Sequence, residues 1–285
     1  MRKAITILFI SLLSCINAIA VQSGKCGDNA TWTLSDDSVL TISGTREIEK
    51  FDIDKNKVKK VIIEDGITNI GRLAFHMYRN LREVIIANSV VCIENYAFGS
   101  CYKLKKIIIP DSLKKIGYRA FSECEELSEI TIPNTVEEIG GFAFYMCDNL
   151  KFNIYDSACY LGNKENPYYV LINPTYKEAS LNKIVDCHIN ERCKIIPEWA
   201  FVLSSIRSVI IPESIKVLGD CAFCNTQLKS IICNTKIPPA TTMDIGFEEK
   251  KITLYVPKES KKAYKKADGW RNFKKIKAIE SLNKK

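Results

Sequence analysis

The sequence predicts a solenoid of stacked turns that share a parallel β-sheet, and three observations support this fold class. The dipeptide Ala-Phe recurs at a spacing of 23 residues and then of 22. A fixed period of about 20 to 50 residues is typical of repeat architectures. Apolar residues between the dipeptides keep one register, and turn-forming segments flank the repeats. The dipeptides are Ala74-Phe75, Ala97-Phe98, Ala120-Phe121, Ala143-Phe144, Ala200-Phe201 and Ala222-Phe223.

Residues 1–20 have the layout of a secretory signal peptide. Arg2 and Lys3 precede an apolar run, and the segment ends in a small-x-small pattern at Ala18 to Ala20. We therefore expect cleavage after Ala20 and a secreted or extracellular cell-surface protein. The alternative is a bacterial lipoprotein signal, which would leave Cys15 as a lipid-anchored N-terminus. The rest of the sequence has no stretch of about 18 apolar residues, so we expect no transmembrane span.

Residues 21–57 are expected to form an N-terminal cap. Apolar residues alternate in segments 32–34 and 39–42, around the polar turn 35–38, which predicts a β-hairpin. This hairpin would cover the open sheet edge of the first turn. Asn29 lies in a glycosylation sequon, which matters only if the source is a eukaryote.

Residues 58–247 are expected to form about eight turns of 22 or 23 residues. In the third turn, Ile107 and Ile109 alternate as in a short strand, which should stop near Pro110 because proline lacks an N–H. Gly117 is expected to permit a tight bend before Ala120-Phe121. The six phenylalanines of the dipeptides should stack in one column, a continuous core that no single turn could bury.

The turn from 143 to 200 departs from this period. The two alanines are 57 residues apart, which is 11 more than two turns require. Turn-forming residues at 163–167 predict a hairpin inserted at about 158–180. It can project as a binding face or pack as a local spacer, and the sequence leaves both open.

Residues 248–285 are expected to form a basic C-terminal cap. They contain 13 basic and 5 acidic side chains, a net charge of +8, whereas residues 21–247 carry −2. Residues 252–256 are strand-like, a segment with helical character follows, and Trp270 and Phe273 should close the last turn. The cap lysines either attract anionic glycans or are simply solvated, and we expect no nucleic-acid partner. The candidate basic patch is Lys261, Lys262, Lys265, Lys266, Lys274 and Lys275.

These residues resemble a known family. The repeat reads L-x-x-I-x-I-P-x-x-V-x-x-I-G-x-x-A-F-x-x-C, and segments 26–44, 162–168 and 254–273 are similar to the family's N-terminal cap, inserted hairpin and terminal segment. The chain resembles the BspA-like leucine-rich-repeat surface proteins with 23-residue treponemal-type repeats. The resemblance covers nearly the whole mature chain and implies a leucine-rich-repeat solenoid that binds proteins, often in adhesion to host matrix or to cells. It leaves the ligand open.

Middle residues of the repeated I-x-I strands form the candidate binding stripe. If the flanking residues point into the core, the middle ones face outward on the concave sheet. An exposed apolar stripe would indicate a protein-binding surface, whereas β-branched residues also favour strands for structural reasons alone. The candidates are Ile62, Ile85, Ile108, Thr131, His188 and Ile210.

Twelve cysteines fall mainly at repeat positions, and 11 would remain after signal cleavage, so at least one is unpaired. Cys101, Cys124 and Cys147 share one position, where a rung spacing of about 4.8 Å exceeds the Cβ separation of about 3.8 Å in a disulfide. We expect buried free thiols there. Any bridge is expected among Cys187, Cys193, Cys221, Cys224 and Cys233. Although Cys221-Ala222-Phe223-Cys224 has the spacing of a redox or zinc motif, its middle residues belong to the repeat, so we expect neither role.

The sequence favours binding over catalysis. Its two histidines, His76 and His188, are not at a recognisable triad spacing, and we expect no catalytic residue, cofactor or metal. The expected function is binding or adhesion to host or self surface proteins or matrix components. The alternatives are a structural surface component without a dedicated ligand and a hydrolase with a spatially assembled site.

Overall fold

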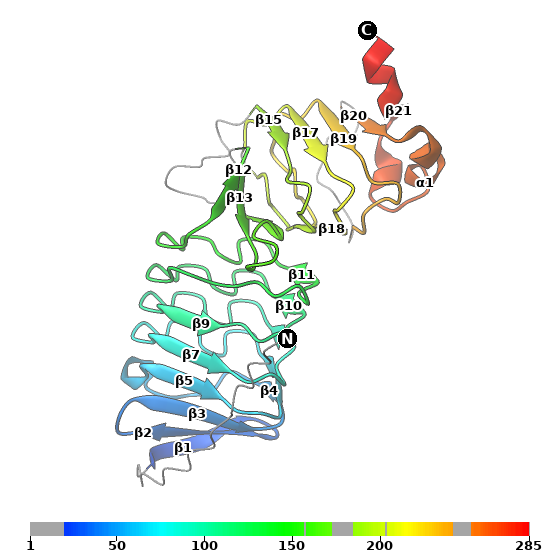
Figure 1. The fold of residues 1–285 in the computed structure, drawn as a ribbon. Helices are drawn as coiled ribbons and strands as arrows, with labels where there is room; N and C mark the ends of the chain where they lie inside the picture. The colour runs from blue at the N-terminus through cyan, green and yellow to red at the C-terminus, as the bar shows by residue number, and fades with distance from the viewer. Residues whose placement is uncertain (1–19, 157, 173–184, 203, 242–251, 285) are drawn as a thin grey trace, which may run out of the picture.

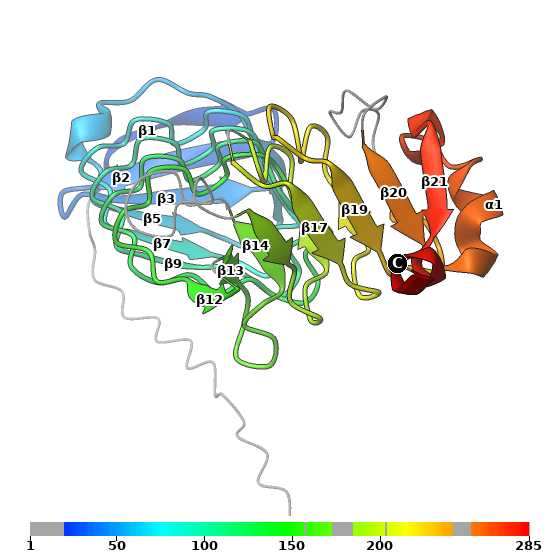
Figure 2. The ribbon, with the colours of Figure 1, turned by 90° about the horizontal axis from the view of Figure 1, so that it is seen from above.

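The structure is a computed structural model that describes residues 20–156, 158–172, 185–202, 204–241 and 252–284. The chain forms a β-solenoid of about 10 turns with parallel sheets and little helix, which confirms the predicted fold class. The first half stacks in one direction, and the second half continues at an angle to it (Figure 1). Viewed from above, strands β17, β19, β20 and β21 extend to one side of the first half (Figure 2).

Two sheets run along the first half. One contains three antiparallel strands followed by three parallel ones, β1 (Ala20–Gly27), β2 (Ala30–Ser35), β3 (Val39–Gly44), β5 (Lys60–Ile63), β7 (Glu83–Ile86) and β9 (Lys106–Ile108). The other is parallel and has shorter strands, β4 (Arg46–Ile48), β6 (Ile67–Ile70), β8 (Cys92–Ile93), β10 (Lys115–Ile116) and β11 (Glu138–Ile139). The pairing of β2 with β3 confirms the predicted cap hairpin, to which β1 adds a strand that was not predicted.

Two further sheets form the second half. A mixed sheet begins with the insertion and contains β12 (Asn153–Tyr155), β13 (Ala158–Leu161), β14 (Val170–Ile172), β16 (Ile195–Ile196) and β18 (Val217–Leu218). A parallel sheet contains β15 (Asp186–His188), β17 (Ser208–Ile211), β19 (Ser230–Cys233), β20 (Thr253–Val256) and β21 (Lys275–Ala278). Helical segments are short, and they are η1 (Lys55–Lys57), η3 (Lys258–Ser260), α1 (Lys261–Tyr264), η4 (Trp270–Asn272) and η5 (Ile279–Lys284).

The number of turns is larger than the eight expected because both caps continue the stack. Strand β3 of the N-terminal cap pairs in parallel with β5, with Leu40 opposite Val61. At the other end β20 pairs in parallel with β19, and β21 with β20. A cap that adds rungs of its own satisfies the backbone groups of the terminal repeat and buries its open core.

The repeated phenylalanines form two stacks and not the single column that we expected. Phe75, Phe98, Phe121 and Phe144 lie at centroid distances of 5.3, 5.5 and 5.6 Å, with planes within 11° of one another. Phe201 and Phe223 form a second stack at 5.2 Å. Buried apolar residues accordingly divide into two clusters, with the boundary at the insertion.

A left-handed residue, and not Gly117, makes the bend of each spine turn. The residue directly before each spine alanine has φ between 50 and 62°. Gly117 has no left-handed φ, and a Cβ there would lie 2.6 Å from the backbone nitrogen of Asn95. Glycine at this position therefore permits close contact between this turn and the preceding one. The left-handed residues are Leu73, Tyr96, Arg119, Phe142, Trp199 and Cys221.

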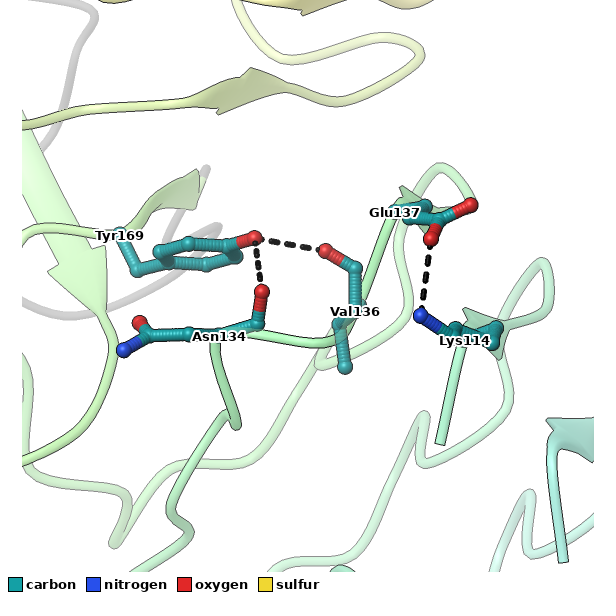
Figure 3. Close-up of polar contacts among 5 residues, drawn as sticks. All are labelled: Lys114, Asn134, Val136, Glu137 and Tyr169. Carbon is teal, nitrogen blue, oxygen red and sulfur yellow. Dashed lines mark hydrogen bonds and ion pairs between the residues drawn. The ribbon is translucent and has the colours of Figure 1, made fainter. Parts of the chain in front are cut away.

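The inserted hairpin packs into the solenoid as a spacer. Strands β13 and β14 pair antiparallel, all their residues are buried, and β14 joins β16 in parallel. Figure 3 shows the Tyr169 hydroxyl between two carbonyl oxygens of the preceding turn, 2.7 Å from that of Val136 and 3.1 Å from that of Asn134. The nearby ion pair of Lys114 with Glu137 measures 2.9 Å. These strands give no support to a projecting hairpin, and residues 173–180 lie outside the described part.

Aromatic packing closes the C-terminal end, as expected. Trp270 is fully buried, and its Nε1 donates a 3.0 Å hydrogen bond to the carbonyl oxygen of Pro239. Its ring contacts Tyr264 at 5.1 Å and Phe273 at 6.0 Å. The cap is thus an integral part of the core, and the candidate lysines extend from this packed segment.

Candidate binding surface

The candidate stripe begins on the outward face of β5, β7 and β9. Ile62, Ile85 and Ile108 lie opposite one another in the parallel register. Ile85 is 37% and Ile108 56% exposed, whereas Ile62 is half-buried. Their neighbours Val61 and Val84 point inward and are fully buried. This alternation confirms the predicted direction of the strands. The outward residues of two sets of parallel strands form a surface that we call the ladder face. The first set is β5, β7 and β9, and the second is β15, β17, β19, β20 and β21.

Opposite charges border this apolar row. Lys60, Glu83 and Lys106 occupy consecutive rungs of the same sheet, and Lys60 Nζ lies 3.1 Å from Glu83 Oε2. A second ion pair links two neighbouring turns, with Lys151 Nζ 3.0 Å from Glu129 Oε1. Alternating signs make the rim polar without giving it a strong net charge. An apolar centre with a polar rim is the usual anatomy of a protein-binding surface.

The second half carries a different row. His188, Ile210, Ile232, Tyr255 and Lys277 lie opposite one another on β15, β17, β19, β20 and β21. His188 is exposed and Ile210 is half-buried. The parallel row beside them is polar and consists of Asp186, Ser208, Ser230, Thr253 and Lys275. Ser208 Oγ donates a 2.5 Å hydrogen bond to Asp186 Oδ1.

The stripe is therefore two rows and not the continuous line that the sequence suggested. Thr131 is exposed but lies outside the strands, because the sheet that contains β5 and β7 ends at β9. At the joint, Ile154 of β12 is 54% exposed and Tyr155 41%. The backbone N–H of His188 donates a 2.7 Å hydrogen bond to Asp156 Oδ2. This hydrogen bond connects the joint to His188, the first residue of the second row.

Sequence reasoning missed three outward residues that the repeat period could have found, one at the joint and two on the ladder face. Ile154 stands 23 residues after Thr131, Ile232 stands 22 after Ile210, and Tyr255 stands 23 after Ile232. Ile154 was missed because it falls in the irregular fifth unit, which lacks an Ala-Phe dipeptide. The last two were assigned to the final repeat and the cap, although their strands continue the ladder.

The basic patch lies on the C-terminal cap. Lys262, Lys265 and Lys266 are exposed on and after α1, and Lys261 is half-buried there. Lys274 and Lys275 are exposed at the start of β21, the outermost strand of its sheet. Helix α1 lies against β21, so the two groups of lysines belong to one end of the molecule. Asn29 of the conditional sequon is exposed in the turn between β1 and β2.

The repeated cysteines are buried free thiols, as predicted. The Sγ atoms of Cys101, Cys124 and Cys147 donate to the carbonyl oxygens of Phe75, Phe98 and Phe121, respectively, at 3.2, 3.3 and 3.1 Å. Burial raises the pKa of Cys101 and Cys147 to about 12, and it raises the pKa of Cys124 as well. We call these three residues the thiol ladder. A disulfide joins Cys221 and Cys224, within the group of cysteines where a bridge was expected.

Neither histidine lies in a recognisable catalytic arrangement. The His76 ring contacts Tyr96 edge-on at 6.1 Å, and burial together with nearby Lys55 lowers its pKa. A hollow of about 560 Å³ lies beside the C-terminal cap and includes Lys216, Lys236 and Ile237, but neither histidine lines it. Among the residues that the structure describes, no group of three or more His, Cys, Asp or Glu could hold a metal ion.

Comparison with known proteins identifies the repeats. The family model described as BspA type leucine rich repeat region matches six copies, in residues 46–165 and 175–243. No curated protein sequence matches the chain. In the described part of the chain, no helix has the length and apolar character needed to cross a membrane.

Three solved structures are similar to this chain. A leucine-rich repeat protein from Eubacterium ventriosum is 19% identical, with 83% of this chain and 78% of that one covered and a TM-score of 0.44. The leucine rich repeat protein of T. pallidum is 23% identical, with coverages of 70% and 77% and a TM-score of 0.38. A leucine rich cell surface protein from Faecalibacterium prausnitzii is 17% identical, with coverages of 92% and 97% and a TM-score of 0.30.

Proposed function

Because this chain belongs to the BspA-type leucine-rich-repeat family, a family of protein-binding scaffolds, we propose that it is a secreted or cell-surface adhesion protein without catalytic activity. Its partner is a surface or matrix protein that docks on the ladder face. In this proposal the mature chain is one folded unit, in which segments 21–57 and 248–285 cap the repeats. The signal peptide that supports export lies in residues 1–20, of which the structure describes only the last.

The observation that carries this proposal is the pair of exposed isoleucines on adjacent rungs. Ile85 and Ile108 lie opposite each other on β7 and β9, and both side chains face solvent. Neither side chain is needed to fill the core, because the inward residues Val84 and Ile107 already do so. Because Ile85 is 37% and Ile108 56% exposed, covering the exposed parts of the two side chains with a partner would contribute about 1 kcal/mol each.

Alanine at both Ile85 and Ile108 is expected to weaken partner binding by about tenfold or more, because two central apolar contacts are lost. Binding is measured on the mature chain against immobilised extracellular-matrix proteins and whole cells, followed by titration of the best binder. The melting temperature should change little, since both side chains are exposed.

Ile237→Ala is the matched control, because it removes an 81% exposed isoleucine that is not on the ladder face. This control should bind like the parent chain. Unchanged binding by the Ile85→Ala/Ile108→Ala variant would overturn the ladder-face proposal. Failure of the parent chain to bind any matrix protein or cell would overturn the adhesion proposal itself.

The basic patch supports a second, electrostatic contact with anionic glycans. Glutamine at Lys262, Lys265, Lys266 and Lys274 is expected to reduce heparin binding by about tenfold at physiological salt, because clustered exposed charges attract a polyanion at contact distances, within the Debye length of about 8 Å. Glutamine at four exposed lysines of the repeats, Lys59, Lys164, Lys229 and Lys236, is the charge-matched control. Equal losses in the two variants would show that net charge alone binds heparin. Substitution is used because deletion of the cap would remove buried Trp270.

A further inference from the structure

The Cys221–Cys224 disulfide differs in environment from every other described cysteine. Its two cysteines are half-buried, whereas Ala222 and Phe223 between them are buried in the spine. The nine free cysteines of the described part are all buried, with exposures of 8% or less. A buried neutral thiol does not form the thiolate that reacts with disulfides or alkylating agents. The accessible sulfur chemistry of the described residues is therefore concentrated at this pair.

The disulfide is not required by the repeat. The other spine turns have residues such as Trp199 and Val202 at the two positions that Cys221 and Cys224 occupy. The thiol ladder belongs to a third position, four residues after the spine alanine. Packing of the repeat thus explains the ladder, but it does not explain a pair of cysteines on either side of the spine dipeptide.

The backbone of this turn also resembles that of the spine turns that have no disulfide. Cys221 has φ of 50°, close to the 51 to 62° of the corresponding residues in five turns that have no disulfide. The N–H of Cys224 donates a 3.0 Å hydrogen bond to the carbonyl oxygen of Cys221. The equivalent bonds in the other five turns measure 3.0 to 3.2 Å. Since the same backbone geometry forms in turns without a disulfide, we expect the turn to stay intact when the disulfide is cleaved.

We propose that Cys221–Cys224 is a thiol–disulfide exchange site that accepts an external thiolate, either a small monothiol or a cysteine of a partner protein. The thiolate sulfur forms a bond to one cysteine sulfur, the Cys221–Cys224 bond breaks, and its electron pair leaves on the other sulfur, which takes a proton from water. A second thiolate then attacks the external sulfur of the mixed disulfide, the bond from that sulfur to the cysteine breaks, and the cysteine sulfur leaves with the electron pair and takes a proton from water. The products are the Cys221/Cys224 dithiol and the disulfide of the two external thiols, so the thiols are the reductant.

Proximity of the two cysteines determines the lifetime of the adduct. Their Cα atoms are 4.8 Å apart, so a freed Cys224 thiolate can attack a mixed disulfide on Cys221 and expel the external thiol. The adduct is therefore short-lived in the native chain. It becomes stable when one of the two cysteines is replaced by serine, because no resolving thiol remains.

The test uses the full-length native chain without denaturant. After treatment with dithiothreitol and then iodoacetamide, peptide mass spectrometry is expected to find alkylation at Cys221 and Cys224 at least about 100-fold faster than at the thiol ladder, since the buried thiols lack accessible thiolate. The far-ultraviolet circular dichroism spectrum should not change. Resistance of the bond to dithiothreitol, or simultaneous alkylation of the ladder, would overturn the proposal.

A second measurement tests the exchange step and separates the two sources of thiolate. The Cys224→Ser variant is expected to form a stable mixed disulfide at Cys221 with oxidised glutathione, releasing one glutathione thiolate, whereas the Cys221→Ser/Cys224→Ser variant forms none at these positions. Incubation of the native chain with reduced glutathione, and separately with a reduced thioredoxin-type protein, shows which thiol opens the bond. Absence of an adduct on Cys224→Ser would contradict an exchange site.

Discussion

Replacement of Phe121 by alanine is expected to lower the free energy of unfolding by about 3 to 5 kcal/mol, the usual loss for a buried phenylalanine. Phe121 is fully buried and stacks between Phe98 and Phe144 at 5.5 and 5.6 Å. Its removal takes contacts from both neighbouring turns and leaves a cavity that their rigid backbones cannot close. Urea denaturation followed by circular dichroism measures the loss.

Phe152→Ala is the control for this prediction. Phe152 packs against the same core but is only half-buried, so its loss should be about 1 kcal/mol. Similar losses for the two variants would contradict the assignment of Phe121 to the spine of the solenoid. They would mean that the stack contributes no more than ordinary apolar contact.

Alkaline pH is expected to destabilise the protein steeply because the thiol ladder titrates only after unfolding. An unfolded cysteine loses its proton near pH 8.5, whereas the pKa of folded Cys101 and Cys147 is about 12. The folded state therefore binds more protons in this interval, and its stability falls as pH rises. Full stability is present below about pH 8.5. Above pH 8.5, each thiol lowers the free energy of unfolding by about 1.4 kcal/mol per pH unit, or about 4 kcal/mol for the three.

Serine at all three ladder positions is the matched control, because a serine hydroxyl can donate the same hydrogen bond but does not titrate in this range. The repeat itself places Ser204 and Thr226 at this position in later turns. The triple variant should have a lower free energy of unfolding at pH 7 than the parent chain. Between pH 9 and 10.5, its free energy of unfolding should fall by about 4 kcal/mol less per pH unit than that of the parent chain. Urea titrations in the presence of a phosphine reductant measure both slopes, and equal slopes would refute the role of the ladder.

The sequence alone was sufficient for the regular part of the fold. The 23-residue period assigned the inward strand residues, the stacking of neighbouring phenylalanines within each half and the free thiol ladder, because each turn repeats the environment of the turn before it. The cap hairpin and the aromatic closure at Trp270 also followed from local pattern. Local signals are sufficient where neighbouring turns are the only partners a residue has.

The same reasoning failed where the period is interrupted. The insertion could pack or project, and the sequence left this open because burial of β13 and β14 depends on the turns on either side. The single phenylalanine column and the single ladder-face row both divide at this joint. Gly117 was assigned to a bend, although its actual constraint is contact with Asn95 in the preceding turn.

What the sequence by itself determined is therefore the repeat, its register and its core, since these follow from the identity and spacing of residues within one turn. Only the tertiary structure decided how much of Ile85 and Ile108 is exposed, that the stack changes direction at the insertion, and that Cys221 and Cys224 are bonded in a turn that does not need the bond. Exposure depends on which atoms of other turns approach a residue, and sulfur pairing depends on the backbone conformation of the turn that holds the two cysteines. The spacing of residues along the chain specifies neither.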